Sequence, residues 1–274
     1  MNEKKERVDI LLVQQQLIET REQAKRAIMA GLVYSGTERI DKPGQKLLLS
    51  SPLRIKGKEH PYVGRGGLKL EKALQAFSVS LTNKIMVDIG ASTGGFTDCA
   101  LQNGARLVYA VDVGTNQLAW SLRSDHRVVV MEKTNFRYAT EDQFDRGLPE
   151  VATIDVSFIS LSLIFPALKD ILAPGGDVIA LIKPQFEAGK ERVGKKGIVR
   201  DPAVHHDVLL STIDMCSQLG FVCRDLTYSP ITGGDGNIEY LAWFQFQAGQ
   251  DVTITSRHIE QVIQNAHLTL AAHA

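Results

Sequence analysis

A buried strand that breaks into a glycine-rich turn is the feature that most constrains the fold of this chain. The apolar run 84–89 carries Asp88 near its end, and the glycine-rich segment 90–95 follows directly and opens a helix. A second apolar strand, 107–111, leads into Asp112. In doubly wound α/β domains such a turn forms a nucleotide-like site at the carboxyl end of the first strand, and a carboxylate after the second strand can accept hydrogen bonds from ribose hydroxyls. The pattern therefore predicts an α/β fold.

The spacing of the glycines indicates which cofactor this turn binds. The fingerprint G-x-G-x-x-G, which brings a helix N-terminus to a pyrophosphate, is absent. The arrangement Gly90-x-Ser92-x-Gly94-Gly95 fits the loop that holds S-adenosylmethionine, so we favour a methyltransferase over a dehydrogenase or an ordinary strand-turn-helix. We expect Asp88 to reach the methionine ammonium directly or through water, Asp112 to bind the ribose, and Asn135-Phe136 to hold the adenine. The expected cofactor residues are Asp88, Gly90, Ser92, Thr93, Gly94, Gly95, Phe96, Asp112, Val113, Asn135 and Phe136.

Charge is distributed unevenly along the 274 residues, although the formal net charge is zero. Residues 1–65 contain thirteen Lys or Arg and eight Asp or Glu, whereas residues 66–274 contain eighteen and twenty-three. Such asymmetry indicates an N-terminal module that faces a polyanion. Because the chain has no apolar run of eighteen residues and no apolar signal core, we expect a cytoplasmic protein that does not engage a membrane. The three cysteines lack C-x-x-C spacing, so we expect neither a disulfide nor a metal site.

The pattern of apolar residues predicts two modules. A small α+β module over 1–58 should contain two helices followed by short strands, with a linker over 59–66 behind it. From 67 to 250 strands and helices alternate, which is typical of a doubly wound sheet, and 251–274 should be a tail or a helix. The last two strands are separated only by a loop and should form an antiparallel hairpin. Strands are expected at 84–89, 107–112, 127–131, 151–155, 177–182, 221–227 and 239–246, and helices at 68–77, 161–172 and 202–219.

Segments of the N-terminal module resemble the S4 RNA-binding domain. They are Arg7-Val-Asp-Ile-Leu-Leu-Val, Thr20-Arg21-Glu-Gln-Ala-Lys25-Arg26, Ala30-Gly31-Leu-Val-Tyr-Ser-Gly and Asp41-Lys-Pro-Gly44. Charges at positions 21, 25 and 26 fall on one face of the second helix, where they can meet phosphates, although a solvated face is the usual role of such charges. The resemblance implies RNA contact by Arg7, Arg21, Lys25 and Arg26.

Four polar residues stand where the pattern predicts that chain ends converge. Lys69 lies at the start of the leading helix of the larger module, and Asp155 and Lys183 follow the fourth and fifth strands. Glu239 opens the last strand. The carboxyl ends of central strands form the ligand crevice of an open α/β sheet, so Asp155 and Lys183 should flank the cofactor. Taken singly, Lys69 and Glu239 would be ordinary surface charges, whereas a lysine that leaves a buried strand is either paired or functional.

The order Lys69, Asp155, Lys183, Glu239 resembles the Lys-Asp-Lys-Glu tetrad of FtsJ-like ribose 2′-O-methyltransferases. Together with Arg65-Gly-Gly-Leu-Lys-Leu, Asp155-Val-Ser-Phe-Ile-Ser and the S4-like module, it makes residues 5–246 similar to the TlyA family of rRNA methyltransferases, also labelled haemolysin A. The resemblance implies a Rossmann-like class I methyltransferase domain with a seven-stranded sheet, preceded by an α+β S4 domain. It further implies methyl transfer from S-adenosylmethionine to a ribose of 16S rRNA, 23S rRNA or both, with cytidine as the nucleoside and ribosomal subunits as partners.

Such a tetrad has to assist the removal of the proton from the ribose hydroxyl as this group attacks the methyl group. Lys183, which leaves a buried strand and should lie near Lys69, could accept this proton or orient the oxygen. Asp155 and Glu239 would hold the two ammonium groups in place. We therefore expect Lys69, Asp155, Lys183 and Glu239 to be catalytic.

The segment after the fourth strand separates this chain from methyltransferases that act on bases. Enzymes that methylate exocyclic amines commonly carry Asn/Asp-Pro-Pro-Tyr/Phe there, and Asp155-Val-Ser-Phe lacks the prolines. A basic, glycine-rich loop over 189–200 predicts a flap that contacts RNA. The expected RNA contacts outside the S4-like module are Arg65, Lys190, Arg192, Lys195 and Lys196. A non-catalytic RNA-binding factor and a membrane-lysing protein stay as alternative functions, and the oligomeric state stays open.

Overall fold

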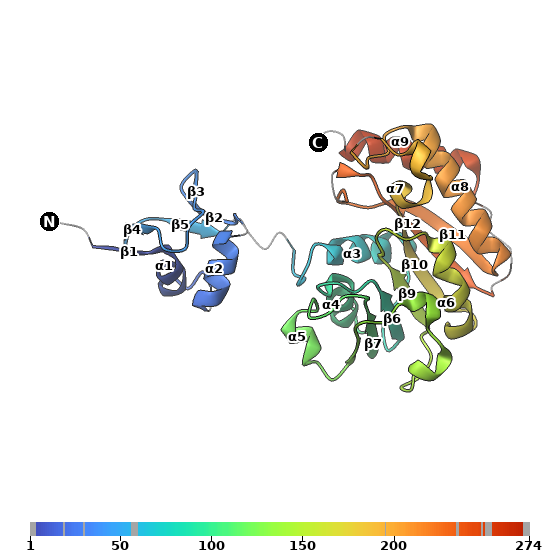
Figure 1. Cartoon of the computed structure of the whole chain (residues 1–274), viewed down its shortest axis with the longest axis horizontal. Coiled ribbons are helices and arrows are strands. Elements are labelled where there is room, and N and C mark those ends of the chain that lie inside the picture. Colours follow the sequence, from blue (N-terminus) through green and yellow to red (C-terminus); the bar gives the residue numbers. More distant parts are fainter. Residues whose placement is uncertain are drawn as a thin grey trace. The chain divides into compact units, whose positions relative to one another are not determined.

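The chain divides into two compact units, Met1–Pro61 and Tyr62–Ala274 (Figure 1). This computed structural model describes residues 4–18, 20–29, 31–55, 60–194, 196–233, 236–247, 249 and 254–270. Each unit has an apolar core of its own, as separate domains do.

The first unit packs two helices against short strands. Helix α2 (Arg21–Met29) begins at a capping box, in which the Thr20 hydroxyl accepts a hydrogen bond from Gln23 N (3.3 Å) and Gln23 Oε1 accepts one from Thr20 N (3.2 Å). Two antiparallel sheets, β1-β4 and β3-β2-β5, complete the unit. The remaining elements are β1 (Lys5–Arg7), α1 (Val8–Gln14), β2 (Val33–Ser35), β3 (Glu38–Arg39), β4 (Lys46–Leu48) and β5 (Leu53–Ile55).

A single mixed sheet forms the centre of the second unit. Its strands are β6 (Ile85–Ile89), β7 (Leu107–Val111), β8 (Val128–Met131), β9 (Val151–Ile154), β10 (Asp177–Ile182), β11 (Phe221–Tyr228) and β12 (Tyr240–Phe246). They lie in the order β11-β12-β10-β9-β6-β7-β8. The pairs from β10 to β8 are parallel, and β12 is antiparallel to both of its neighbours. The seven strands and the antiparallel pair at one edge confirm the predicted fold class.

Helices cover both faces of this sheet because the side chains of its strands alternate between two apolar clusters. Met86 packs into one cluster with α3 (Gly66–Phe77), α4 (Gly95–Gln102) and α5 (Trp120–Arg123). Val87 packs into the other with α6 (Phe165–Ile171), α8 (Pro202–Gln218) and α9 (Ser256–Leu270). None of the described helices combines the length and the apolar character needed to cross a membrane.

The expected helix over 161–172 is divided in the structure. A 3-10 turn, Leu161–Leu163, precedes α6, which carries Pro166 in its first turn. Proline lacks an N–H group and favours the first turn of a helix, so the α-helix begins there and not at 161. The remaining short elements are α7 (Pro184–Glu187) and the 3-10 turns Phe136–Tyr138, Glu141–Gln143 and Lys190–Arg192.

The order of the strands reverses at β6, and this reversal positions the site. The next strand in the sequence, β7, lies on one side of β6, whereas β9 lies on the other. The loops that follow β6 and β9 meet closely: a Cβ atom on Gly90 (φ +89°) would lie 2.5 Å from the carbonyl oxygen of Asp155. Only glycine permits this approach. Open α/β sheets bind their ligands at such a point.

Candidate active site

A cavity of about 520 Å³ opens at the carboxyl edge of the central strands. The loops after β6 and β9, the start of α3 and the loop before β12 line it. A second hollow of about 490 Å³ adjoins it and extends past Asp112 and Asn135. Gly90, Ser92 and Asp155 border both spaces, so the two hollows meet beside the glycine loop.

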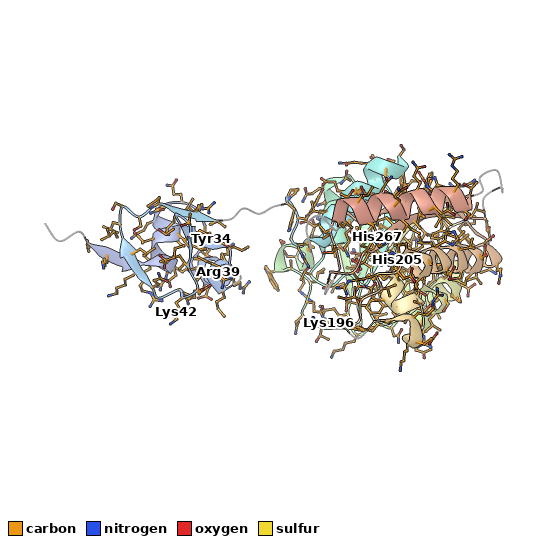
Figure 2. The ribbon with its side chains drawn as sticks, turned by 90° about the horizontal axis from the view of Figure 1, so that it is seen from above. Tyr34, Arg39, Lys42, Lys196, His205 and His267 are labelled. Carbon is orange, nitrogen blue, oxygen red and sulfur yellow. The ribbon has the colours of Figure 1, made fainter. Side chains whose placement is uncertain are left out.

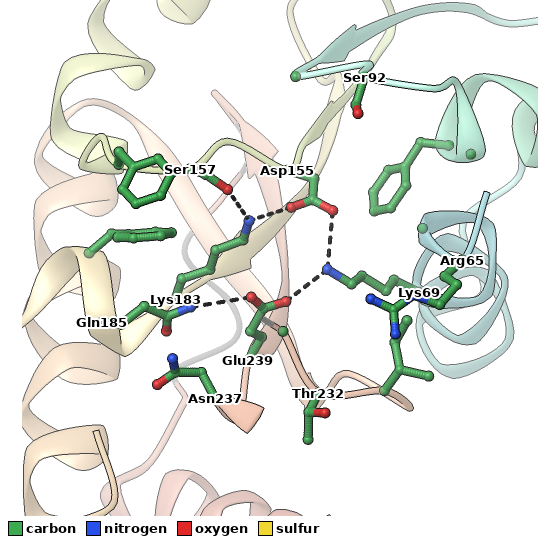
Figure 3. A pocket seen from close by; sticks show the side chains of 18 of the residues that line it. Arg65, Lys69, Ser92, Asp155, Ser157, Lys183, Gln185, Thr232, Asn237 and Glu239 are labelled. Atoms are coloured by element: carbon green, nitrogen blue, oxygen red, sulfur yellow. Dashed lines mark hydrogen bonds and ion pairs between the residues drawn. The ribbon is translucent and has the colours of Figure 1, made fainter. Parts of the chain in front are cut away.

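The structure brings together the four residues expected to be catalytic (Figure 3). Lys69 Nζ lies 2.7 Å from Glu239 Oε2 and 3.2 Å from Asp155 Oδ2. Lys183 Nζ lies 2.5 Å from the other oxygen of Asp155, Oδ1. The four side chains therefore form a continuous chain of ion pairs, and both carboxylates are occupied by ammonium groups.

The topology of the sheet explains this convergence. Asp155 and Lys183 directly follow the parallel strands β9 and β10, so both stand at the carboxyl edge. Glu239 directly precedes β12, and an antiparallel strand begins where its parallel neighbours end. Lys69 comes from the beginning of α3 and reaches the same point.

Burial and pairing together set the charges in this cluster. Lys69, Lys183 and Glu239 are 8%, 6% and 2% exposed. Burial opposes the charge of Lys69, but attraction to Asp155 and Glu239 outweighs it, so the pKa of Lys69 is raised. Burial likewise opposes the charge of Asp155, but the two lysines hold the pKa of this carboxyl below its ordinary value. Lys69 is therefore an ammonium and Asp155 a carboxylate at neutral pH.

Two polar contacts that the sequence reasoning missed hold the ends of the ion-pair chain. Lys183 Nζ donates a hydrogen bond to Ser157 Oγ (3.3 Å), and Gln185 Nε2 donates one to Glu239 Oε1 (3.3 Å) (Figure 3). Gln185 lies on α7, which begins at Pro184 directly after Lys183. A proline after a buried strand signals the start of a helix, so this signal could have pointed to residues of α7.

The same short helix also fixes the loop that carries Ser157. The half-buried carboxylate of Glu187 accepts hydrogen bonds from Ser160 Oγ (2.7 Å) and from Leu161 N (2.8 Å). Burial raises the pKa of Glu187. These two bonds tie α7 to the segment that leaves β9.

Most of the expected cofactor residues border the two hollows. Gly90, Ser92, Thr93, Gly95 and Phe96 line the first, and Gly90, Ser92, Asp112, Val113, Asn135 and Phe136 line the second. The carboxylate of Asp112 accepts hydrogen bonds from the backbone N–H groups of Ser92 and Gly114, both at 2.7 Å. Asp112 therefore fixes the glycine loop as well as facing the hollow.

Asp88 and Gly94, also expected at the cofactor, do not line either hollow. Asp88 is fully buried, and its two oxygens accept hydrogen bonds from Thr97 Oγ1 (2.7 Å) and Thr153 Oγ1 (3.0 Å). Burial raises the pKa of Asp88 to about 6. The structure thus places Asp88 beneath the glycine loop, where it joins α4 to β9. Its side chain does not line the cavity, although the sequence suggested that it reaches the cofactor directly or through water.

The expected RNA-contacting residues of the first unit are partly held by acidic neighbours. Arg7 Nε and an Arg21 nitrogen lie 2.9 and 3.0 Å from the oxygens of Asp9, whose side chain is fully buried. Lys25 pairs with Glu22, and Arg26 is exposed. The buried carboxylate orients the two guanidinium groups at the surface.

The basic residues that were expected to contact RNA in the second unit differ in their surroundings. Arg65 lines the cavity, and Arg192 pairs with Asp207. Lys196, labelled in Figure 2, and Lys190 are exposed, whereas Lys195 lies outside the described residues. Asn237 anchors the basic loop, since its side chain accepts a hydrogen bond from Val199 N (3.1 Å) and donates one to Gly197 O (2.9 Å).

The sheet and the cluster of Lys69, Asp155, Lys183 and Glu239 beside a glycine loop define a Rossmann-like methyltransferase domain. Residues 62–246 match the model of the FtsJ-like methyltransferase family, and residues 6–51 match that of the S4 domain. The chain belongs to the FtsJ-like methyltransferases that carry an S4 domain and include TlyA. This confirms the family and the α/β fold that the sequence resemblance implied. In the part of the chain that the structure describes, no group of side chains is arranged to hold a metal ion.

Named relatives support this membership over the whole chain. YqxC of Bacillus subtilis, provisionally named an rRNA methyltransferase, is 62% identical over 98% of this chain and 97% of its own. TlyA of Mycobacterium tuberculosis, named a 16S/23S rRNA (cytidine-2′-O)-methyltransferase, is 38% identical over 95% of this chain and 96% of its own. A solved structure from Streptococcus thermophilus, provisionally named a hemolysin, is 54% identical, with a TM-score of 0.78 over 98% of each chain.

Proposed function

We propose that this protein transfers a methyl group from S-adenosylmethionine to a ribose 2′-hydroxyl of 16S rRNA, 23S rRNA or both, with cytidine as the nucleoside. The observation that carries the proposal is the chain of ion pairs from Glu239 through Lys69 and Asp155 to Lys183 at the mouth of the cavity. The name of the Mycobacterium tuberculosis relative supports the substrate. Ribosomal subunits in the cytoplasm would then be its partners.

The residues around the second hollow fit S-adenosylmethionine. Gly90 leaves room where a Cβ atom would fill the space beside Asp155, and the Asp112 carboxylate can accept hydrogen bonds from ribose hydroxyls. Phe136 and Asn135 offer an apolar wall and an amide at the far end of this hollow. When bound there, S-adenosylmethionine supplies a methyl group on a positively charged sulfur, which is already activated for attack.

The ion-pair chain can prepare a hydroxyl group for attack. A ribose hydroxyl is a poor nucleophile and must lose its proton as it reacts. Lys183 is the lysine that contacts only one of the two carboxylates, and its Nζ also faces Ser157 in the cavity. We assign two possible roles to Lys183: as an ammonium it orients the oxygen of the hydroxyl, and as a neutral amine, after giving its own proton to solvent, it accepts the proton of the hydroxyl. Asp155, Lys69 and Glu239 hold Lys183 in place. General base catalysis of this kind contributes about 10²–10⁴-fold, and positioning contributes the rest.

The two units would have different roles in RNA binding and catalysis. We assign residues 1–58 to RNA binding, 59–66 to the linker and 67–250 to catalysis. In this assignment the RNA contacts are made by basic residues of both units, namely Arg7, Arg21, Lys25, Arg26, Arg65, Lys190, Arg192, Lys195 and Lys196. Phosphate contacts by Lys and Arg supply sequence-independent affinity, so the choice of nucleotide would come from the shape of the rRNA and not from these charges.

Methyl transfer from tritiated S-adenosylmethionine to purified ribosomal subunits tests the proposal. We expect Lys183→Ala to lower kcat by about 10²–10⁴-fold and to leave the affinity for S-adenosylmethionine unchanged. Lys169→Ala, which removes an exposed lysine from α6, is the matched control and should transfer at the wild-type rate. Transfer by Lys183→Ala at the wild-type rate would refute the assignment. Wild-type protein that binds subunits without transferring methyl groups would instead be a non-catalytic factor.

A further inference from the structure

One face of the three-stranded sheet in the first unit carries an aromatic ring between two guanidinium groups. Tyr34 on β2 pairs directly with Arg39 on β3 and with Arg54 on β5. Residues directly opposite one another in an antiparallel sheet project from the same face, so the three side chains form one row across the sheet. Tyr34 and Arg39 are labelled in Figure 2.

The other face of the same sheet belongs to the core. Val33 and Leu53 alternate with Tyr34 and Arg54 along their strands, and both are buried with side chains of α1 and α2. The row of Tyr34, Arg39 and Arg54 therefore lies on the face turned away from the helices. Arg39 and Arg54 are exposed, and Tyr34 is partly exposed.

Tyr34 is the only aromatic residue among residues 1–61 of the sequence. The apolar core of this unit is built from aliphatic side chains and alanine, and Tyr34 is not part of it. Aromatic side chains contribute more buried area to a core than any others. A small unit that keeps its single ring outside such a core uses it for something other than packing.

Both guanidinium groups are held in place beside the ring. The Arg54 guanidinium lies 5.2 Å from the centre of the Tyr34 ring, and its Nε donates a hydrogen bond to Gly36 O (3.1 Å). Arg39 Nε lies 2.7 Å from Asp41 Oδ1. These two interactions involve the Nε atom of each arginine. Because the side chains are already ordered, a ligand that binds to this row has less conformational entropy to remove.

We propose that this row is an RNA-binding surface of the S4 unit, on which an unstacked base lies against Tyr34 while Arg54 and Arg39 contact the neighbouring phosphates. It is separate from the surface formed by Arg7, Arg21, Lys25 and Arg26, which lie at the start of α1 and on α2. Aromatic side chains and arginines that stack with unpaired bases are a common way of binding single-stranded RNA. The inference extends the proposed function, because it takes RNA as the substrate.

Binding of the full-length protein to deproteinised rRNA and to purified ribosomal subunits tests the surface. Loss of one stacked base raises Kd by about 5-fold or more, so we expect Tyr34→Ala to raise Kd by at least that factor. Tyr34→Phe keeps the ring and should bind like the wild type, whereas Tyr34→Leu keeps only apolar bulk and should bind like Tyr34→Ala. Thermal unfolding of each variant shows whether the S4 unit stays folded.

Salt dependence separates the ring from the guanidinium groups. Each contact to a phosphate of a single strand contributes about 0.7 to the slope of log affinity against log salt. We expect Arg54→Ala to reduce the slope by about this amount, and Tyr34→Ala to leave it unchanged. Arg106→Ala removes an exposed arginine of the second unit that directly precedes β7. It should change neither Kd nor the salt slope.

The outcomes distinguish this surface from the proposed enzyme activity. If a folded Tyr34→Ala variant binds rRNA and subunits with wild-type affinity, the proposed surface is wrong, whether or not the protein transfers methyl groups. Weaker binding to subunits with unchanged binding to deproteinised rRNA would assign the row to a ribosomal protein and would also overturn it. Absence of methyl transfer by the wild-type protein would instead count against the proposed function, and the binding measurements would still test the surface.

Discussion

Asp88 offers a sharp test, because the sequence and the structure assign it different roles. The sequence suggested that Asp88 reaches the methionine ammonium of the cofactor directly or through water, whereas the structure buries Asp88 between Thr97 and Thr153. The substitution Asp88→Asn keeps the size of the side chain and removes its charge. If Asp88 serves only to anchor the glycine loop, the variant should bind S-adenosylmethionine with unchanged affinity and should differ from the wild type in the pH dependence of its stability.

The magnitude follows from the raised pKa of this carboxyl. A carboxyl whose pKa is higher in the folded than in the unfolded chain binds more protons when folded, so stability falls as the pH rises between the two values. One pH unit of difference corresponds to about 1.4 kcal/mol. For Asp88, with a folded pKa of about 6 against the ordinary 3.8, the free energy of unfolding should fall by about 3 kcal/mol between about pH 4 and about pH 7.

Urea unfolding at a series of pH values measures this effect. Other groups titrate equally in both proteins, so the difference between Asp88→Asn and the wild type isolates Asp88. This difference should move by about 3 kcal/mol in favour of the variant as the pH rises from acid to neutral. Asp170→Asn, an exposed position on α6, serves as the control and should show no such trend. A flat difference for Asp88→Asn would refute the argument from burial, and weaker binding of S-adenosylmethionine by this variant would restore the cofactor contact.

Two further predictions concern the residues around the cavity. Asp112→Ala should weaken binding of S-adenosylmethionine by about 10-fold or more, because the lost carboxylate faces the hollow and also fixes the N–H groups of Ser92 and Gly114; calorimetric titration measures this, and unchanged affinity would contradict it. Glu187→Gln should destabilise the protein by about 1–3 kcal/mol and lower kcat, because an amide has one oxygen in place of the two that accept these hydrogen bonds. Affinity for S-adenosylmethionine should stay unchanged, and thermal unfolding with steady-state kinetics will show whether it does.

The identity of the elements and the composition of the ion-pair cluster could be predicted from local sequence patterns. Apolar runs and turn residues indicated all seven strands of the sheet and its antiparallel edge, because the period of the side chains is a property of neighbouring residues. The rule that parallel strands end at one edge was sufficient to group Asp155 with Lys183. Glu239 joined them because it opens the last strand of the expected antiparallel hairpin.

The surroundings of individual side chains could not be predicted in this way. Asp88 projects on the same side of β6 as Met86, toward the helices α3 and α4, and its partner Thr153 comes from the neighbouring strand. Which face of the sheet receives those helices is a property of the whole topology. The same holds for Gln185 and Ser157, whose contacts with the ends of the ion-pair chain depend on how α7 and the loop after β9 pack together.

The sequence by itself therefore determined which segments become strands and helices, and which charged residues reach the carboxyl edge of the sheet. Only the tertiary structure decided that Asp88 lies below the glycine loop and that Asp155 stands between two lysines. It also decided that Tyr34 stays outside the core of its unit. The physical reason is that periodicity and turn chemistry act over a few neighbouring residues, whereas burial and ion pairing depend on segments that are distant in the chain and meet only when it folds.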